Sequence, residues 1–182
     1  MIQKAARDFA QNELLPGVIE RDTKMEFAHE QIKKMGELGF LGLMVGPKYG
    51  GSGMDTISYV LAMEEISKID NSASVCMSVC NSLVNWGLEK YGTEEQKQKY
   101  LVPLATGEKI GAFALSEPEA GSDATSQQTT AVDMGDHYIL NGTKNWITNG
   151  GNASTYLVIA QTDVEKGHRG INVLIVEKGM EG

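Results

Sequence analysis

The sequence predicts an α+β protein, in which an all-α helical bundle at residues 1–109 precedes an antiparallel β domain at residues 110–182. Apolar residues recur at helical spacing throughout the first of these regions. From Ile110 onward the apolar runs become short and end at turn-forming residues, which is typical of strands joined by turns. This change of period predicts a domain boundary near Lys109.

Composition narrows the class of protein. The 182 residues are 41% hydrophobic and 22% charged, which is typical of a globular chain. A net charge of −8 without a basic cluster argues against nucleic acid as the main partner. The longest uncharged stretch, Asn71 to Leu88, is interrupted by serine and asparagine, so no membrane span is predicted. Cys76 and Cys80 indicate core thiols in a reducing compartment, with neither a disulfide framework nor a metal site.

Proline and glycine separate the first helices. The pair Pro16-Gly17 interrupts the initial amphipathic helix, and a second helix is expected from His29 to Leu38. Gly36, Gly39 and Gly42 then follow at regular spacing. They indicate close helix packing and a helix stop rather than a phosphate-binding loop, which would need a preceding strand.

Capping residues mark two later helices. Asp55 is expected to cap a helix from Thr56 to Ile69. Thr93 begins a capping-box sequence before a short charged helix that ends at about Leu101. Pro103 is expected to end the helical region.

The helix expected between these two, from Asn71 to Tyr91, has a second face that is polar, small and uncharged. A water-facing helix usually carries lysine and glutamate on such a face. The face therefore either packs tightly on another helix or lines a cavity that holds a partly polar ligand. Its members are Ser74, Ser78, Asn81, Ser82 and Asn85.

The β region contains a hairpin signal and two further strands. Thr129–Val132 and Tyr138–Leu140 flank a turn, which predicts a hairpin. Lys144 to Thr148 is expected to continue the sheet. Two more strands are expected at Thr155–Gln161 and Ile171–Val176.

Phe113 to Asp123 reads as a buried strand that enters a turn, because an apolar run ends at serine, proline and glycine. Such a turn can direct backbone N–H groups and the hydroxyls of Ser116 and Ser122 at one acceptor, for example a phosphate. A solvated loop is the alternative interpretation. A second polar stretch, Tyr138 to Thr148, follows at a short distance and ends in Asn-Gly-Gly.

These two stretches together resemble the flavin-binding signature of the acyl-CoA dehydrogenases. The matching segments are Ser-Glu-Pro-Glu-Ala-Gly-Ser-Asp and Leu-Asn-Gly-Thr-Lys-Asn-Trp-Ile-Thr-Asn-Gly, and the likeness covers nearly the whole chain. Met77 to Leu83 looks most like the short-chain, butyryl-type branch. The resemblance implies FAD as the cofactor and α,β-dehydrogenation of acyl-CoA thioesters as the reaction.

The resemblance also implies roles for individual residues. Trp146 would pack flat against the isoalloxazine ring, and the Thr148 hydroxyl would reach its N5 edge. Ser116 would contact the ring edge, and Ser122 would lie near the phosphates and the CoA arm. Ser78, Ser82 and Ser122 would contact substrate. The complete set assigned to FAD is Phe113, Leu115, Ser116, Gly121, Ser122, Trp146, Ile147 and Thr148.

In this family a glutamate of a C-terminal helical bundle removes the α-proton, and none of the glutamates here is expected to replace it. Glu64 and Glu65 are adjacent on one helix and point in different directions, so structural or surface roles are expected for them. Glu117 and Glu119 belong to the first motif, and Glu119 stands where family members often have a small or neutral residue. The sequence is therefore interpreted as part of a longer chain, with no catalytic residue, an incomplete β domain and no activity of its own.

Partners and location follow from the same resemblance. It implies an acyl-CoA substrate, electron transfer flavoprotein as a partner, and a homo-oligomer, tetramer or dimer, for the full-length protein. A cytoplasmic location is expected, or the mitochondrial matrix in a eukaryote. Two alternatives use the same motifs: a related flavoprotein oxidase or monooxygenase, and a non-catalytic binding module that has lost the flavin.

Overall fold

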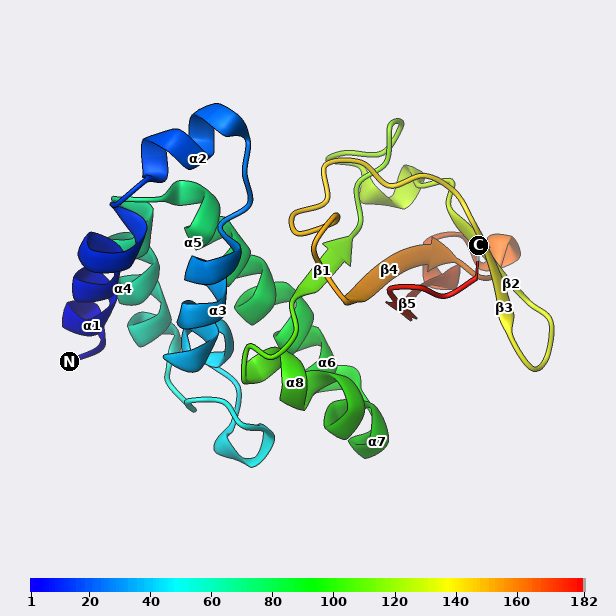
Figure 1. The fold of residues 1–182 in the computed structure, drawn as a ribbon. Helices are drawn as coiled ribbons and strands as arrows, with labels where there is room; N and C mark the ends of the chain where they lie inside the picture. The colour runs from blue at the N-terminus through cyan, green and yellow to red at the C-terminus, as the bar shows by residue number, and fades with distance from the viewer. Residues whose placement is uncertain (182) are drawn as a thin grey trace. The chain divides into compact units, whose positions relative to one another are not determined.

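The computed structural model describes residues 1–181 and divides the chain into two compact units, Met1–Ile110 and Gly111 onward (Figure 1). The first unit is helical and the second contains a five-stranded sheet. This confirms the predicted α+β class.

The helical unit is built from short helical segments that follow one another with few residues between them. Its α-helices are α1 (Ile2–Phe9), α2 (Val18–Lys24), α3 (His29–Glu37), α4 (Thr56–Ser67), α5 (Asn71–Ser78), α6 (Trp86–Tyr91), α7 (Glu94–Gln96) and α8 (Val102–Ala105). The π-helical and 3₁₀ segments are η1 (Ala10–Leu14), η2 (Phe40–Gly42), η3 (Pro47–Tyr49), η4 (Val79–Asn85) and η5 (Lys97–Leu101).

Local signals place most helix boundaries where they were predicted. Gly17 has a φ of +76°, a left-handed conformation that separates η1 from α2. The Asp55 side chain accepts from the N–H of Ser58 at 2.8 Å and caps α4. The Thr93 hydroxyl and the Gln96 side chain form the expected capping box of α7.

One predicted boundary is wrong. Pro103 does not end the helical region but lies in the first turn of α8, which continues to Ala105. Leu101 and Val102 keep helical backbone angles, so the proline lies within a continuing helical run. The adjoining segment η5 is π-helical, so the regular i→i−4 bonding that proline would interrupt is already altered there.

The core of the helical unit is apolar and contains the close packing that the glycines predicted. A Cβ at Gly36 would lie 2.7 Å from the Cα of Gly107, and one at Gly42 would lie 2.3 Å from the backbone oxygen of Ala105. Larger residues at these two positions would therefore separate the segments. The core cluster itself is made of Ala6, Phe9, Ala10, Leu14, Ile32, Met35, Phe40, Leu41, Leu43, Tyr59, Ala62, Ile66, Ala73, Cys76, Met77 and Cys80.

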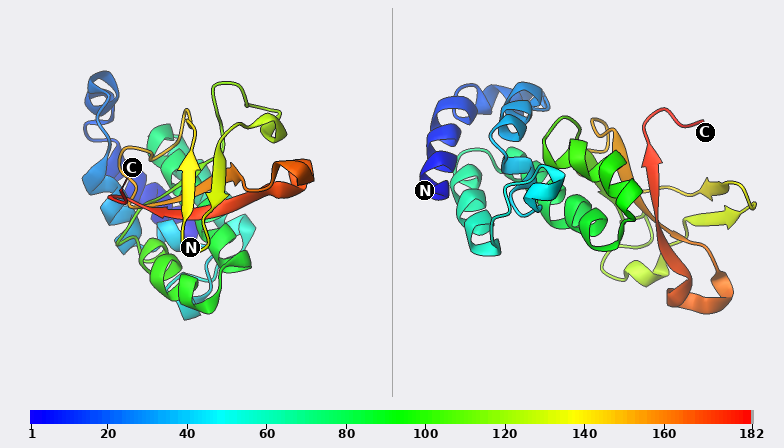
Figure 2. Two further views of the ribbon diagram at one scale, coloured as in Figure 1. Left: turned by 90° about the vertical axis from the view of Figure 1, so that its right-hand side faces the viewer. Right: turned by 90° about the horizontal axis from the view of Figure 1, so that it is seen from below.

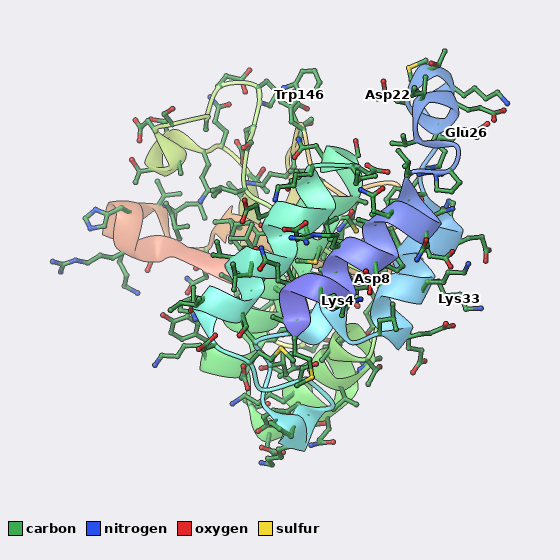
Figure 3. The ribbon with its side chains drawn as sticks, turned by 90° about the vertical axis from the view of Figure 1, so that its left-hand side faces the viewer. Lys4, Asp8, Asp22, Glu26, Lys33 and Trp146 are labelled. Atoms are coloured by element: carbon green, nitrogen blue, oxygen red, sulfur yellow. The ribbon has the colours of Figure 1, made fainter. Side chains whose placement is uncertain are left out.

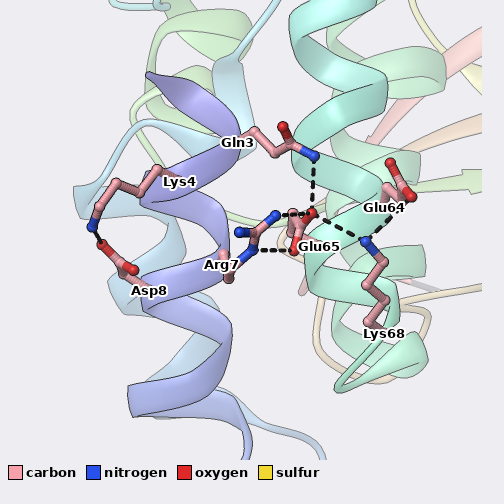
Figure 4. Close-up of polar contacts among 7 residues, drawn as sticks. All are labelled: Gln3, Lys4, Arg7, Asp8, Glu64, Glu65 and Lys68. Carbon is pink, nitrogen blue, oxygen red and sulfur yellow. Dashed lines mark hydrogen bonds and ion pairs between the residues drawn. The ribbon is translucent and has the colours of Figure 1, made fainter.

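A buried carboxylate joins α1 to α4 (Figure 4). Glu65 accepts two hydrogen bonds of 2.9 Å from the Arg7 guanidinium and further ones from Lys68 and Gln3. The bonds from Arg7, followed by the one from Lys68, lower the pKa of Glu65 from 4.5 to about 2. Glu64 pairs with Lys68 at 3.2 Å. Both glutamates therefore have structural ion-pair roles, as predicted.

The β unit contains a mixed sheet rather than a purely antiparallel one. Strand β4 (Thr155–Gln161) pairs with β5 (Ile171–Glu177) along its whole length and in antiparallel orientation. On the other edge of β4, β1 (Gly111–Ala114) and then β2 (Thr130–Asp133) pair in parallel orientation. Strand β3 (Tyr138–Asn141) completes the predicted antiparallel hairpin with β2, which Figure 2 shows in yellow-green and yellow.

A second prediction fails in this unit. Residues 144–148 form no strand, because the backbone leaves the extended conformation there. Trp146 has a φ of +59° and Asn149 a φ of +66°, both left-handed. This segment is therefore a loop, and its side chains are positioned by contacts outside the regular ladder of the sheet.

Among residues 1–181, the structure has no helix both long enough and apolar enough to cross a membrane.

Candidate functional site

The two sequence motifs lie on two loops of the β unit that contact each other. The first loop (residues 115–129) connects β1 to β2, and the second loop (residues 142–150) is part of the connection between β3 and β4. The N–H of Asn145 donates to the backbone oxygen of Ser116 at 2.9 Å. The two loops therefore contact each other although they are far apart in the sequence. Leu115 and Lys144, for example, are 29 residues apart and share a hydrogen bond.

A buried ion pair underlies this contact. The Lys144 ammonium lies 2.7 Å from the Glu117 carboxylate, and their side chains are only 10% and 2% exposed. Lys144 also donates to the backbone oxygen of Leu115 at 2.9 Å and to the Gln127 side-chain oxygen at 3.0 Å. One ammonium group therefore contacts both ends of the first loop.

The Glu117 carboxylate is held in its ionised form. Burial by itself raises the pKa of Glu117, but hydrogen bonds from Lys144, Thr129 and the N–H of Gln128 outweigh burial, and the pKa falls from 4.5 to about 2. The N–H of Gln128 donates to it at 2.6 Å and that of Thr129 at 3.0 Å. At neutral pH the carboxylate is thus a fixed acceptor and not a proton carrier.

Trp146 is the most prominent side chain of the second loop. It is 95% exposed and stands on the loop outside the sheet (Figure 3). Its left-handed backbone is uncommon for a bulky residue and costs free energy. Strain of this kind, together with an exposed indole, is typical of a ligand-contacting position.

The remaining predicted cofactor residues are distributed over the same two loops and β1. Ser116 and Thr148 are half-buried, whereas Gly121 and Ser122 are exposed on the first loop. Phe113, in β1, pairs with Leu157 of β4, and Leu115 begins the first loop. Ile147 lines a hollow of 580 Å³ in the β unit, together with Ala114, Thr129, Leu140, Gly142, Lys144, Gly150, Tyr156, Val158 and Val176.

Ser78 and Ser82 belong to the helical unit. The Ser78 hydroxyl accepts from the Tyr59 hydroxyl at 2.9 Å, and the Ser82 hydroxyl donates to the Ser78 backbone oxygen at 2.8 Å. Both are half-buried. On the same polar face, Asn81 and Asn85 donate to the backbone oxygens of Phe40 and Leu41 at 2.8 and 2.9 Å, so that part of the face packs on η2.

The residues of the two loops suit a flavin in their chemistry. An exposed indole offers a broad face for stacking on a planar ring. Hydroxyls at Ser116 and Thr148 can donate to ring heteroatoms or accept from ring N–H groups. The exposed Ser122 can donate to a phosphate.

Lys144 and Glu117 are the site residues that the sequence did not reveal as partners. The motifs contain both residues, but the sequence predicts only that Glu117 is not the base and that Lys144 belongs to an expected strand. The available signal was one lysine inside the second motif and one glutamate near the start of the first, opposite charges in two otherwise small and polar segments.

Two family models together cover nearly all of the chain. The model described as "Acyl-CoA dehydrogenase, N-terminal domain" matches residues 1–108. The model described as "Acyl-CoA dehydrogenase, middle domain" matches residues 112–182.

Individual relatives agree with these matches. The short-chain specific acyl-CoA dehydrogenase of Clostridium acetobutylicum is 49% identical over 182 residues, which are 100% of this chain and 48% of that protein. A chain in the solved structure of the electron transferring flavoprotein of Acidaminococcus fermentans is 51% identical with a TM-score of 0.97, over 100% of this chain and 48% of that one. A glutaryl-CoA dehydrogenase from Mycobacterium smegmatis, solved in complex with FADH2, is 38% identical with a TM-score of 0.93, over 100% of this chain and 45% of that one. The chain thus spans about half the length of the relatives it matches.

Proposed function

The chain belongs to the acyl-CoA dehydrogenase family, and on that premise we propose that the full-length protein is an FAD-dependent enzyme that dehydrogenates short-chain acyl-CoA thioesters at the α,β position. The observation that carries this proposal is the meeting of the two motif loops at Ser116 and Asn145, beside the exposed indole of Trp146. The flavin would supply the two-electron oxidation. This chain would supply the surface that binds and orients the flavin.

In this proposal Trp146 stacks on the isoalloxazine ring. Thr148 and Ser116 contact the polar edge of the ring, and Ser122 lies near the phosphates. Apolar contacts come from Phe113, Leu115 and Ile147, and Gly121 lets the first loop approach the cofactor closely.

The general base is not assigned to a glutamate of the motif or of α4. A base should have a pKa near the working pH to accept a proton efficiently. Glu65 and Glu117 both have a pKa of about 2 and are held in ion pairs, so each is a poor proton acceptor at neutral pH. On the family resemblance, the proposal places the base outside residues 1–182, and these residues alone are expected not to turn over acyl-CoA.

The short-chain preference rests on similarity to the enzyme from Clostridium acetobutylicum, which is named as short-chain specific. Ser78 and Ser82 are proposed to line the acyl pocket, because both are half-buried hydroxyls on a helix face without charge. Electron transfer flavoprotein is proposed as the electron acceptor, supported by the similar chain in the structure from Acidaminococcus fermentans. A homo-oligomer is proposed for the full-length protein, located in the cytoplasm, or in the mitochondrial matrix of a eukaryote.

The proposed function is tested with the full-length protein. It is expected to be yellow after purification or after addition of FAD, and its flavin absorbance should bleach when butyryl-CoA is added without oxygen. A colourless protein that takes up no FAD would contradict the proposal and favour a binding module. Rapid reoxidation of the bleached flavin by oxygen alone would favour an oxidase.

The substrate assignment has its own test. Ser78→Leu and Ser82→Leu should change kcat/KM across acyl chain lengths, while FAD content stays constant. Ser72→Leu is the matched control, because Ser72 lies on the same helix as Ser78 but is exposed. An unchanged chain-length profile in both variants would mean that the two serines only pack.

A further inference from the structure

The Lys144–Glu117 ion pair has no part in the proposed chemistry, yet it lies where the two motif loops meet. Resting on the proposed function, we propose that this pair is a positioning device that holds Trp146 and Ser116 in one flavin-binding surface. Neither charged group needs to touch the cofactor for this role. Both are buried, and each contacts backbone groups of the first loop.

Glu117 links the start of the first loop to its end. It stands near the start of the loop, whereas the N–H groups of Gln128 and Thr129, which donate to its carboxylate, stand at the end. The exposed Ser122 lies on the segment enclosed by these bonds. The Glu117 carboxylate therefore joins the two ends of the segment that carries Ser122.

Lys144 attaches the second loop to the two ends of the first loop. Its ammonium donates to Leu115, Glu117 and Gln127, and the next residue, Asn145, donates its N–H to Ser116. The second loop also approaches the first very closely before this point. A Cβ at Gly142 would lie 2.7 Å from the Cα of Thr129, so the two backbones meet where only glycine fits.

Trp146 takes its direction from these contacts. At 95% exposure its indole gains little packing of its own, so its direction follows from the backbone on either side. On one side are Lys144 and Asn145. On the other, the Asn149 amide donates to the backbone oxygen of Gly111 in β1 at 3.0 Å. The left-handed φ of Trp146 is maintained between these two attachments.

A buried ion pair is a costly way to gain stability alone. Removing two charges from water carries a desolvation penalty, and apolar side chains of similar size often stabilise a fold as well or better. A buried charged pair does favour one geometry, because any buried oxygen or N–H left without a hydrogen bond costs free energy. Here the partners are backbone groups of irregular loops, whose positions no helix or strand determines.

The test measures FAD affinity of the full-length protein by titration of the apoprotein, together with the visible circular dichroism of the bound flavin. Lys144→Met and Glu117→Gln should each raise the Kd for FAD about tenfold and change the flavin spectrum, because a loosely supported site binds less well. In the apoprotein, amide exchange of residues 143–150 should become faster in both variants. The double variant Glu117→Gln/Lys144→Met leaves no unpaired charge, so it keeps the test valid if a single variant fails to fold.

The helical unit provides the matched control. Glu65 is likewise buried, ionised and paired with a lysine, but it lies away from both motifs in the sequence. Glu65→Gln should lower the melting temperature while the Kd for FAD stays within about twofold of wild type. An equal loss of FAD affinity in Glu65→Gln would overturn the positioning role, because general destabilisation would then explain the effect.

The outcomes separate this proposal from the proposed function. If wild type binds FAD and Trp146→Ala weakens binding, but the folded pair variants bind like wild type, the positioning role alone is wrong. If wild-type protein takes up no FAD, the proposed function fails and the positioning role fails with it. Weakened binding and faster loop exchange in the pair variants, with Glu65→Gln unaffected in both, would support the proposal.

Discussion

The helical unit and the β unit each bury a glutamate in an ion pair, and the two pairs act on different kinds of structure. Glu65 bonds to side chains of helices that apolar packing already places, with 16 buried residues in the core cluster. Glu117 bonds to backbone N–H groups of a loop. The ion pair of Glu65 therefore reinforces helix positions that apolar packing already determines. The ion pair of Glu117 itself determines the position of a loop.

Apolar exposure does not distinguish the two units, because both leave large apolar side chains at the surface. Val132, Tyr138 and Val173 are more than half exposed on the β unit, and so are Ile57 and Val60 on the helical unit. The difference lies in what each glutamate bonds to: side chains of packed helices in one unit, and loop backbone in the other.

The largest expected effect comes from the helical core. Phe40 is 2% exposed and its ring centroid lies 5.7 Å from that of Phe9. Phe40→Ala should lower the free energy of unfolding by about 3–5 kcal/mol, because it leaves a cavity. Denaturant unfolding measures this. A loss below about 1 kcal/mol would show that packing does not dominate this unit.

The next effect concerns the exposed indole. Trp146→Ala should raise the Kd for FAD at least about tenfold, because the stacking face is lost. The free energy of unfolding of the apoprotein should change by no more than about 0.5 kcal/mol, since an exposed side chain leaves no cavity. FAD titration and denaturant unfolding give the two values. A large loss of apoprotein stability would mean that Trp146 is a packing residue, and the contrast with Phe40 would disappear.

The pH dependence of stability tests whether Glu117 is ionised and paired in the folded protein. Because the pKa of Glu117 is lowered from 4.5 to about 2 on folding, its contribution to stability is complete above about pH 5 and is lost as the pH falls toward 2. Between pH 5 and pH 3.5 wild type should lose about 1 kcal/mol more stability than Glu117→Gln. Urea unfolding at both pH values gives the difference. Parallel stability curves for the two proteins would contradict an ionised, paired Glu117.

The smallest effect should come from a helix cap. Asp55→Ala should lower the free energy of unfolding by roughly 0.5–1 kcal/mol, because α4 loses the acceptor for the N–H of Ser58. Asp55→Asn is the matched control, since asparagine keeps a capping oxygen and should cost less. Equal losses in the two variants would assign the effect to the charge rather than to the cap.

The sequence predicted the helical unit well because its signals are local. A capping aspartate or a left-handed glycine acts within a few residues, as Asp55 and Gly17 show. The motif loops were identified, but their geometry was not. The strand expected from Lys144 to Thr148 is replaced by a loop, because contacts to Ser116, Glu117 and Gly111 favour a left-handed Trp146 over an extended one. Those partners are 27 or more residues away in the chain, beyond the reach of local patterns.

The parallel pairing of β1 and β2 with a single edge of β4 has a consequence for how the site can change. Register is determined at both ends of the first loop, where Ala114 pairs with Val158 and Thr130 pairs with Gln161. Both ends of the first loop are thus held by pairing with the same strand, β4. Residues between Glu117 and Gln128 can therefore change without shifting β4 against β5. Because Gly121 and Ser122 lie in this segment, a change there would alter the proposed cofactor contacts while the register of the sheet is kept.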